Sequence, residues 1–265
     1  METLRLYVLF LRLALRSRMQ YRSNVFVGIV SLMIFNGVNL ALISVLLSRF
    51  QTIQGWQYWE IVMLYSMWML SHCIYSMFFW HLTTFENDII QGVFDQYLIR
   101  PCSPLMQLLG RGINFMGMSD VVFGVIAFVV AYIRLGAHWT LGQWLFFVVA
   151  ILSGTIIETC IIWIIASWSF WIGRTSATAG AVVHFNLLIQ QYPLDMFGKW
   201  FQVFMTGFLP FAFINYYPLT VLLGKTNISS VRGVAFLSPV VAVLLIAVGA
   251  VIWTRGVQRY TSSGN

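Results

Sequence analysis

Charged residues are scarce in this chain of 265 amino acids. Only 9% of its residues are Asp, Glu, Lys or Arg, whereas 60% are hydrophobic and 17% are aromatic. Soluble domains carry about a quarter charged residues, so a water-soluble protein of this composition would expose a large apolar surface and aggregate. The composition therefore excludes a soluble globular domain and predicts an integral membrane protein.

Residues that build metal sites, disulfides and nucleotide sites are few or badly spaced. The three cysteines, Cys73, Cys102 and Cys160, form no CxxC motif, and the four histidines show no paired spacing. This pattern supports neither a metal site nor a disulfide framework. Residues 224–226, GKT, match the end of a phosphate-binding loop, but Leu219 stands where that motif requires its first glycine. We therefore predict no catalytic residue, no metal and no cofactor in this chain.

Long apolar runs make up most of the sequence. A run of about 20 apolar residues crosses a bilayer core. The predicted spans are 25–47, 59–80, 113–133, 141–170, 176–190 and 234–254. A further apolar stretch, 200–214, is too short for a span and is interrupted by Gly207 and Pro210, so we predict a re-entrant segment there. The expected fold is one all-α transmembrane domain over residues 1–265, with six transmembrane helices.

Basic residues near the ends of these spans predict their orientation. With six spans, ten of the 15 Lys and Arg residues fall on one side of the membrane and five on the other. Because basic residues are enriched in cytoplasmic loops, we expect both termini in the cytoplasm and the 200–214 segment on the outer side. This bias also accounts for the net charge of +7. We expect no nucleic-acid partner.

The first 22 residues carry an amphipathic pattern. At about 100° per residue, Arg5, Arg12 and Arg16 share one side of a helix and Tyr7 lies on the other. The pattern predicts an interfacial helix over residues 1–22 whose arginines contact lipid headgroups at the inner surface. The alternative is a positively charged flank with no further role.

A long polar stretch, 85–112, separates the second and third predicted spans. Its sequence is FENDIIQGVFDQYLIRPCSPLMQLLGRG. Apolar residues recur at three- and four-residue steps from Ile89 to Leu98, and Pro101 and Pro104 end the pattern. We predict a short amphipathic helix within residues 85–104 that packs into a groove on a cytoplasmic partner. The alternative is a loop that folds back on its own spans.

Two segments resemble the permeases of ABC-2 type transporters, the membrane half of one class of ATP-binding-cassette exporter. GVFDQYLIRPCSPLMQLL at 92–109 is similar to that family's cytoplasmic loop between spans two and three. FLPFAFINYYPLTVLLGK at 208–225 is similar to the segment before its last span. The resemblance covers essentially the whole chain, and it is greatest to the subfamily in which two different permeases are made with one ATPase.

The resemblance implies a division of labour in a bacterial inner membrane. A separate ABC ATPase, in two copies, would bind ATP and Mg²⁺, and a second permease, the same or different, would complete the path for a hydrophobic or amphiphilic substrate. The resemblance also implies that the helix within 85–104 couples the permease to the ATPase. The implied coupling residues are Glu86, Asp88, Phe94, Asp95, Tyr97, Leu98 and Arg100.

Ionisable residues inside spans are costly in hydrocarbon and normally face a cavity or a partner. Glu158 is the clearest one, and it is expected to attract a cationic substrate, to pair with His184 or with an arginine of a partner permease, or to be a buried carboxylate that serves packing. Asp120 is expected to be an interfacial or helix-start residue, with a transport role as the alternative, and His72 and His184 are expected to be hydrogen-bonded core residues. The candidate path residues are Glu158, His184, Asn215 and Tyr216.

Small residues repeat along the fifth predicted span and allow another helix to approach closely. The candidate permease–permease contact consists of Gly173, Ala177, Gly180 and Ala181, although packing within the chain would use the same residues.

The alternative functions are an ion-coupled secondary transporter and a non-transporting membrane scaffold. A secondary transporter usually has paired halves with interrupted helices, and this sequence shows no such repeat.

Overall fold

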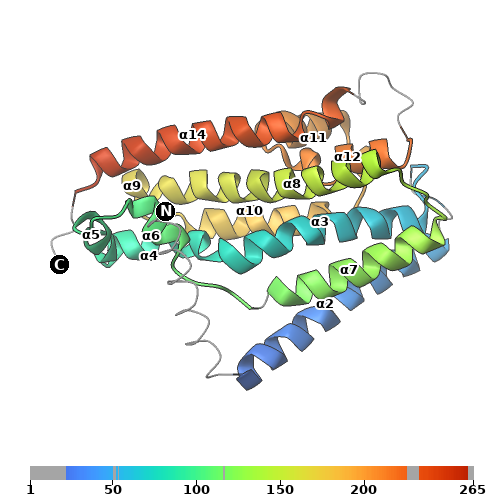
Figure 1. The fold of residues 1–265 in the computed structure, drawn as a ribbon, viewed down its shortest axis with the longest axis horizontal. Helices are drawn as coiled ribbons and strands as arrows, with labels where there is room; N and C mark the ends of the chain where they lie inside the picture. Colours follow the sequence, from blue (N-terminus) through green and yellow to red (C-terminus); the bar gives the residue numbers. More distant parts are fainter. Residues whose placement is uncertain (1–21, 50–51, 53, 116, 226–232, 262–265) are drawn as a thin grey trace.

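The computed structural model describes residues 22–49, 52, 54–115, 117–225 and 233–261. In this part of the chain every regular element is a helix, and the helices form an elongated bundle (Figure 1). Those long and apolar enough to cross a membrane are α2 (Arg22–Arg49), α3 (Tyr58–Phe78), α7 (Gly117–Arg134), α8 (Leu141–Ser167) and α14 (Ser238–Arg259). The all-helical membrane fold is thereby confirmed. The predicted interfacial helix, apart from Arg22, lies outside the described residues.

The fifth predicted span corresponds to α10 (Ser176–Ile189), which is 14 residues long and thus shorter than a full crossing. A short helix, α9 (Ser169–Ile172), precedes it, and the two are separated at Gly173, whose φ is +74°. α10 packs alongside α8 (Figure 1). The described helices therefore include five of spanning length, and a count of six spans stays a prediction.

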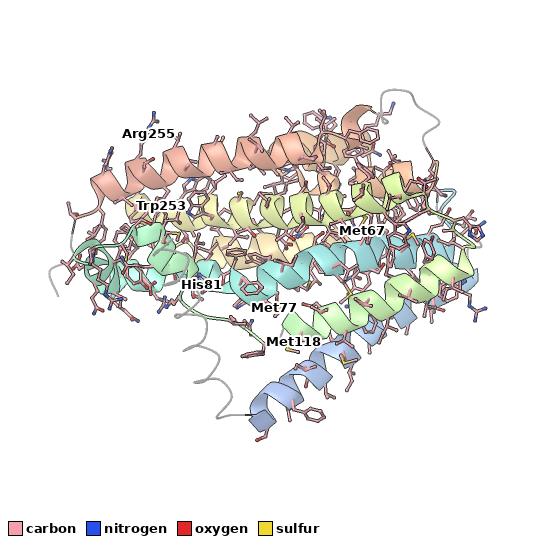
Figure 2. The ribbon with its side chains drawn as sticks, viewed as in Figure 1. Met67, Met77, His81, Met118, Trp253 and Arg255 are labelled. Atoms are coloured by element: carbon pink, nitrogen blue, oxygen red, sulfur yellow. The ribbon has the colours of Figure 1, made fainter. Side chains whose placement is uncertain are left out.

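Local signals start the helices, and glycines let them approach one another. The backbone N–H of Thr140 donates to Oε1 of Gln143 at 2.8 Å in a capping box that opens α8. A Cβ added at Gly249 of α14 would lie 2.6 Å from the ring of Trp163 on α8. A Cβ at Gly117 of α7 would lie 2.6 Å from the side chain of Met77, where α3 passes the start of α7 (Figure 2). These contacts require the absence of a side chain.

Short elements gather at one end of the bundle (Figure 1). They are η2 (Trp80–Thr84), α4 (Glu86–Ile90), α5 (Val93–Leu98), α6 (Pro104–Leu109) and α9. The prediction of one amphipathic helix from residue 86 to residue 100 was wrong, because Gly92 adopts a left-handed conformation with φ of +69°. Glycine reaches this conformation without steric cost, and the conformation interrupts the helix between α4 and α5.

The predicted re-entrant segment is broken into several short helices at the opposite end of the bundle. They are α11 (Lys199–Val203), the π-helical turn η4 (Phe204–Phe208), the 3₁₀ helix η5 (Phe211–Phe213) and α12 (Tyr216–Leu222). Pro210 lies at the break between η4 and η5. The turn between α7 and α8 lies at this same end (Figure 1). The depth of these helices in a membrane stays a prediction.

Candidate functional site

Glu86 connects α4 to the N-terminus of α10. Its buried carboxylate accepts hydrogen bonds from the backbone N–H of Ser176 at 2.7 Å and from the Ser176 hydroxyl at 2.5 Å, and also from the backbone N–H of Thr175. α10 has no capping side chain of its own at Thr175. Glu86 therefore supplies, from 89 residues away in the sequence, the acceptor that a helix N-terminus needs.

The carboxyl group of Glu86 is held in its charged form. Burial alone works to raise its pKa, but the hydrogen bonds from Ser176 and Thr175, together with the charge of Arg174, outweigh burial and hold the pKa of Glu86 below its ordinary value. A negative charge at this point is also favoured by the positive end of the α10 helix dipole. The contact between α4 and α10 is thus charged as well as hydrogen-bonded.

Asp88 and Tyr97, two further predicted coupling residues, also face the bundle. Asp88 is 2% exposed, and its Oδ1 accepts a hydrogen bond from Nη1 of Arg111 at 2.6 Å. Tyr97 is buried, and its hydroxyl donates to Oδ2 of Asp88 at 3.4 Å. Arg111 follows α6, so this group ties α4 and α5 to the segment that leads into α7.

Phe94 lies in an aromatic cluster, which consists of Phe85, Phe94, Phe170, Trp253 and Tyr260. Its ring centroid lies 5.2 Å from that of Phe170, 6.0 Å from that of Trp253 and 5.0 Å from that of Tyr260. Figure 2 shows Trp253 on the bundle side of α14, whereas Arg255 points away from the bundle. Phe94 is fully buried. Its expected place in a partner contact is therefore corrected, because its ring fastens α5 to α9 and α14.

The outward surface of α4 and α5 carries exposed apolar side chains. We call Ile90, Leu98 and Ile99, which are 42%, 45% and 83% exposed, the end residues. Arg100 is exposed next to them in the sequence, and Asp95 is partly exposed. Among the predicted coupling residues, Leu98 and Arg100 are thus the ones that a partner would reach most easily.

Glu158 belongs to a buried polar network between α3, α8 and α10. It is 1% exposed, and its Oε1 lies 2.8 Å from Nδ1 of His72 and accepts a hydrogen bond from Nδ2 of Asn186 at 2.9 Å. Gln190 donates from Nε2 to Oδ1 of Asn186 at 3.0 Å and to the carbonyl of Phe211 at 3.0 Å. Of the alternatives considered for Glu158, the structure shows a buried, hydrogen-bonded carboxylate, whose Oε1 is paired with His72 and Asn186 rather than with His184.

A cavity of about 450 Å³ opens between α2, α3, α7 and α10. Its polar lining includes Asn36, Asp120 and His184, and two of its aromatic lining residues are Trp68 and Trp80. Oδ1 of Asp120 accepts a hydrogen bond from Nδ2 of Asn36 at 3.2 Å. The described lining residues include no Lys or Arg, and the ionisable side chains in the lining are Asp120, His72 and His184.

The cavity corrects the expectation for one histidine. His184 was expected to be a hydrogen-bonded core residue, but it is exposed and lines the cavity. Glu158 does not line the cavity, whereas His72, its hydrogen-bond partner, does, so a role of Glu158 in a substrate path stays a prediction.

The other two predicted path residues, Asn215 and Tyr216, hold the segment from η5 to α12 in place. Asn215 is 1% exposed, and its Nδ2 donates to the carbonyls of Leu64 at 3.1 Å and Gln190 at 3.2 Å. The hydroxyl of Tyr216 donates to Oδ1 of Asp195 at 2.6 Å. Neither residue lines the cavity. Their contacts connect this segment to α3, to the end of α10 and to η3 (Leu194–Met196).

The small residues proposed for a permease–permease contact lie on an open face of α10. Ala177, Gly180 and Ala181 are exposed, and Gly173 is partly exposed. A Cβ added at Gly180 would meet no atom within 4 Å, and Gly180 also lines the cavity. The face is accessible, and its use as an interface stays a prediction.

A sequence-family profile described as ABC-2 family transporter protein matches residues 33–264, which include the cavity, the polar network and the α4–α6 end. The chain belongs to this family. Comparisons with curated proteins and with solved structures gave no significant match. Permeases of the ABC-2 family are membrane transport subunits, and ATP hydrolysis normally takes place in a separate subunit.

Sequence reasoning undervalued two features of this ABC-2 permease. Asp120 lies in the first turn of α7, as expected of a helix-start residue, but it also lines the cavity. Asn186 was not singled out, although Asn186 and Gln190 stand four residues apart in an apolar segment. That spacing places two amides on one face of a helix, which was the available signal for a buried hydrogen-bond chain.

Proposed function

We propose that this chain is the permease subunit of an ATP-driven exporter in a bacterial inner membrane. The α4–α6 end would be cytoplasmic, as would both termini, and it would dock a separate ABC ATPase present in two copies. A second permease, identical or different, would pack against the open face of α10. The substrate class best suited to the cavity is a hydrophobic or amphiphilic compound, with a preference for cations.

The observation that carries this proposal is that the α4–α5 element is fastened to the bundle on one side and exposes apolar side chains on the other. Its inner side is fastened to the bundle by Glu86, Asp88 and the aromatic cluster. Its outer side presents the end residues to solvent, and Ile99 is 83% exposed. An apolar side chain that is costly to leave in water is typical of a contact with a protein partner. An element fixed on one side and apolar on the other is suited to transmit force from a docked subunit.

The preference for a cation is supported by the cavity. Asp120 provides a carboxylate there, and Trp68 and Trp80 provide aromatic surfaces. Aromatic rings attract organic cations through their quadrupole, and a carboxylate in surroundings of low dielectric constant strengthens that attraction. The remaining apolar lining suits the rest of an amphiphile.

The docking proposal is tested by placing an acid among the end residues. The permease is tagged and purified from its native membranes, and the eluate is assayed for a protein with a phosphate-binding loop and for ATP hydrolysis. In Ile99→Asp the ATPase activity in the eluate should fall about tenfold or more, since a charge buried in a docking groove costs several kcal/mol. His138→Asp is the matched control, because His138 is exposed at the α7–α8 turn, at the other end of the bundle.

The outcomes separate the possible functions. Loss of the ATPase in Ile99→Asp, with retention in His138→Asp, supports docking at the α4–α5 end. Equal retention in both variants contradicts it. Transport driven by an ion gradient, with no ATPase in the wild-type eluate, would instead identify a secondary transporter.

A further inference from the structure

We propose that Glu86 transmits movement of the docked ATPase to the substrate cavity. It would act as a positioning residue that transfers displacement of α4 to α10. We call its contact with Thr175 and Ser176, which connects α4 to α10, the joint. This inference rests on the proposed function and goes beyond it, because it assigns a route from the docking element to the cavity wall.

The N-terminus of α10 is not rigidly joined to the helix that precedes it in the chain. Gly173, with φ of +74°, separates α10 from α9, so α10 is not a rigid continuation of the helix before it. Its N-terminus has no capping side chain of its own. The acceptors for the backbone N–H groups of Thr175 and Ser176 come from Glu86 on α4. The position of this helix end is therefore set by the docking element.

α10 forms part of the wall of the cavity. Ser176, which is bonded to Glu86, itself lines the cavity. Gly180, Val183, His184 and Leu187 of the same helix continue the lining along successive turns. Displacement of the N-terminus of α10 would therefore change the shape of the cavity directly.

The C-terminal end of α10 is held by hydrogen bonds to the bundle and not by the docking element. Asn186 is bonded to Glu158 of α8 at 2.9 Å, and Gln190 is bonded to the carbonyl of Phe211 at 3.0 Å. The open face of the helix, with Ala177, Gly180 and Ala181, lies between these ends. An element fixed to the bundle at one end and to the docking element at the other pivots when the docking element moves.

The test compares transport with ATP hydrolysis in the reconstituted complex of permease and ATPase. A fluorescent organic cation is the transport probe, and the quantity measured is the number of cations moved per ATP hydrolysed. In Glu86→Ala this ratio should fall about tenfold, the factor that corresponds to about 1.4 kcal/mol. The amount of bound ATPase and its rate of hydrolysis are measured in the same sample, so that the ratio counts only ATP hydrolysed by assembled complexes.

Two further variants separate the joint from a general loss of stability. Glu86→Gln should recover part of the ratio, because its amide oxygen still accepts from the N–H groups of Thr175 and Ser176. Glu60→Gln is the matched control, because Glu60 also caps a helix, accepting from the N–H of Gln57 at 2.7 Å, and pairs with Lys225 at 2.7 Å. It lies near the start of α3, at the far end of the bundle, and should leave the ratio unchanged.

The results distinguish failure of the joint from failure of the proposed function. A wild-type number of cations moved per ATP in Glu86→Ala, or an equal fall of this ratio in Glu60→Gln, would overturn the role of Glu86 but not the proposed function. If Glu86→Ala does not fold, the single variants Ser176→Ala and Glu86→Gln are compared instead. A wild-type number of cations moved per ATP in both variants would then overturn the proposed role of Glu86. A wild-type complex that moves no probe in response to ATP would overturn the proposed function, and the joint with it.

Discussion

Replacement of Phe94 by Ala separates the packing of the α4–α5 element from its contact with a partner. Phe94 is fully buried among five aromatic residues, and Leu98, four residues later on the same helix, is 45% exposed. The two side chains are similar in hydrophobicity. The structure nevertheless places them differently: Phe94 fastens α5 to α9 and α14, whereas Leu98 is exposed, and the docking proposed above would use Leu98.

The magnitudes follow from this difference in burial. Removal of a buried Phe side chain costs about 3–5 kcal/mol, because both its apolar contacts and the filled volume are lost. In a chain of this size each kcal/mol lowers the Tm by roughly 2–4 °C, so Phe94→Ala should lower the Tm by roughly 6–20 °C. Leu98→Ala, at a half-exposed position, should cost about 0.5 kcal/mol and lower the Tm by about 2 °C or less.

The assay measures two properties of each purified variant. Tryptophan fluorescence during heating gives the Tm of the permease in detergent, and ATP hydrolysis in the eluate gives the amount of bound ATPase at a temperature where both variants are folded. We expect Phe94→Ala to lose stability while folded protein still binds the ATPase, and Leu98→Ala to show the reverse. An unchanged Tm in Phe94→Ala together with loss of the ATPase would refute this reasoning, because it would place Phe94 in the partner contact.

Two other predictions concern the cavity and the joint. Asp120→Asn should weaken binding of an organic cation about tenfold, measured by quenching of tryptophan fluorescence, whereas Glu158→Gln should lower the Tm with little change in cation affinity; the reverse pattern would place the substrate at Glu158. The folded protein holds the pKa of Glu86 below its ordinary value of 4.5, so the stability contributed by this charged carboxylate is present above pH 4.5 and is lost as the pH falls through the lower pKa of the folded state. The difference in Tm between wild type and Glu86→Gln should therefore shrink with acidification below pH 4.5, and a difference that grows with acidification would contradict the charged cap.

The sequence predicted the long helices well, because an apolar run of spanning length is a local property. It also placed the polar stretch that forms α4, α5 and α6 between the second and third predicted spans. It did not reveal which side of that element faces the bundle. Apolar residues occur on more than one face of α4 and α5, and burial of Phe94 in contrast to exposure of Leu98 depends on Phe170 and Trp253, which are distant in the sequence.

Glu86 illustrates the same limit for polar residues. An acidic residue in the first turn of α4 suggests a favourable interaction with the dipole of its own helix. Its acceptor oxygens are used instead by Thr175 and Ser176 at the start of another helix. A pairing across this distance follows from tertiary packing. Likewise, the sequence placed Glu158 in the interior correctly but gave no means to choose His72 and Asn186 over His184 as its partners.

The most direct test of ATPase docking is a photo-crosslink from a single position. A benzophenone amino acid is placed at Ile99, which is 83% exposed at the α4–α5 end, and in a second variant at His138, exposed at the opposite end. After irradiation in native membranes, we expect a covalent product between the permease and its ABC ATPase from position 99 and none from position 138. A crosslink to the ATPase from position 138, or none from position 99, would contradict it.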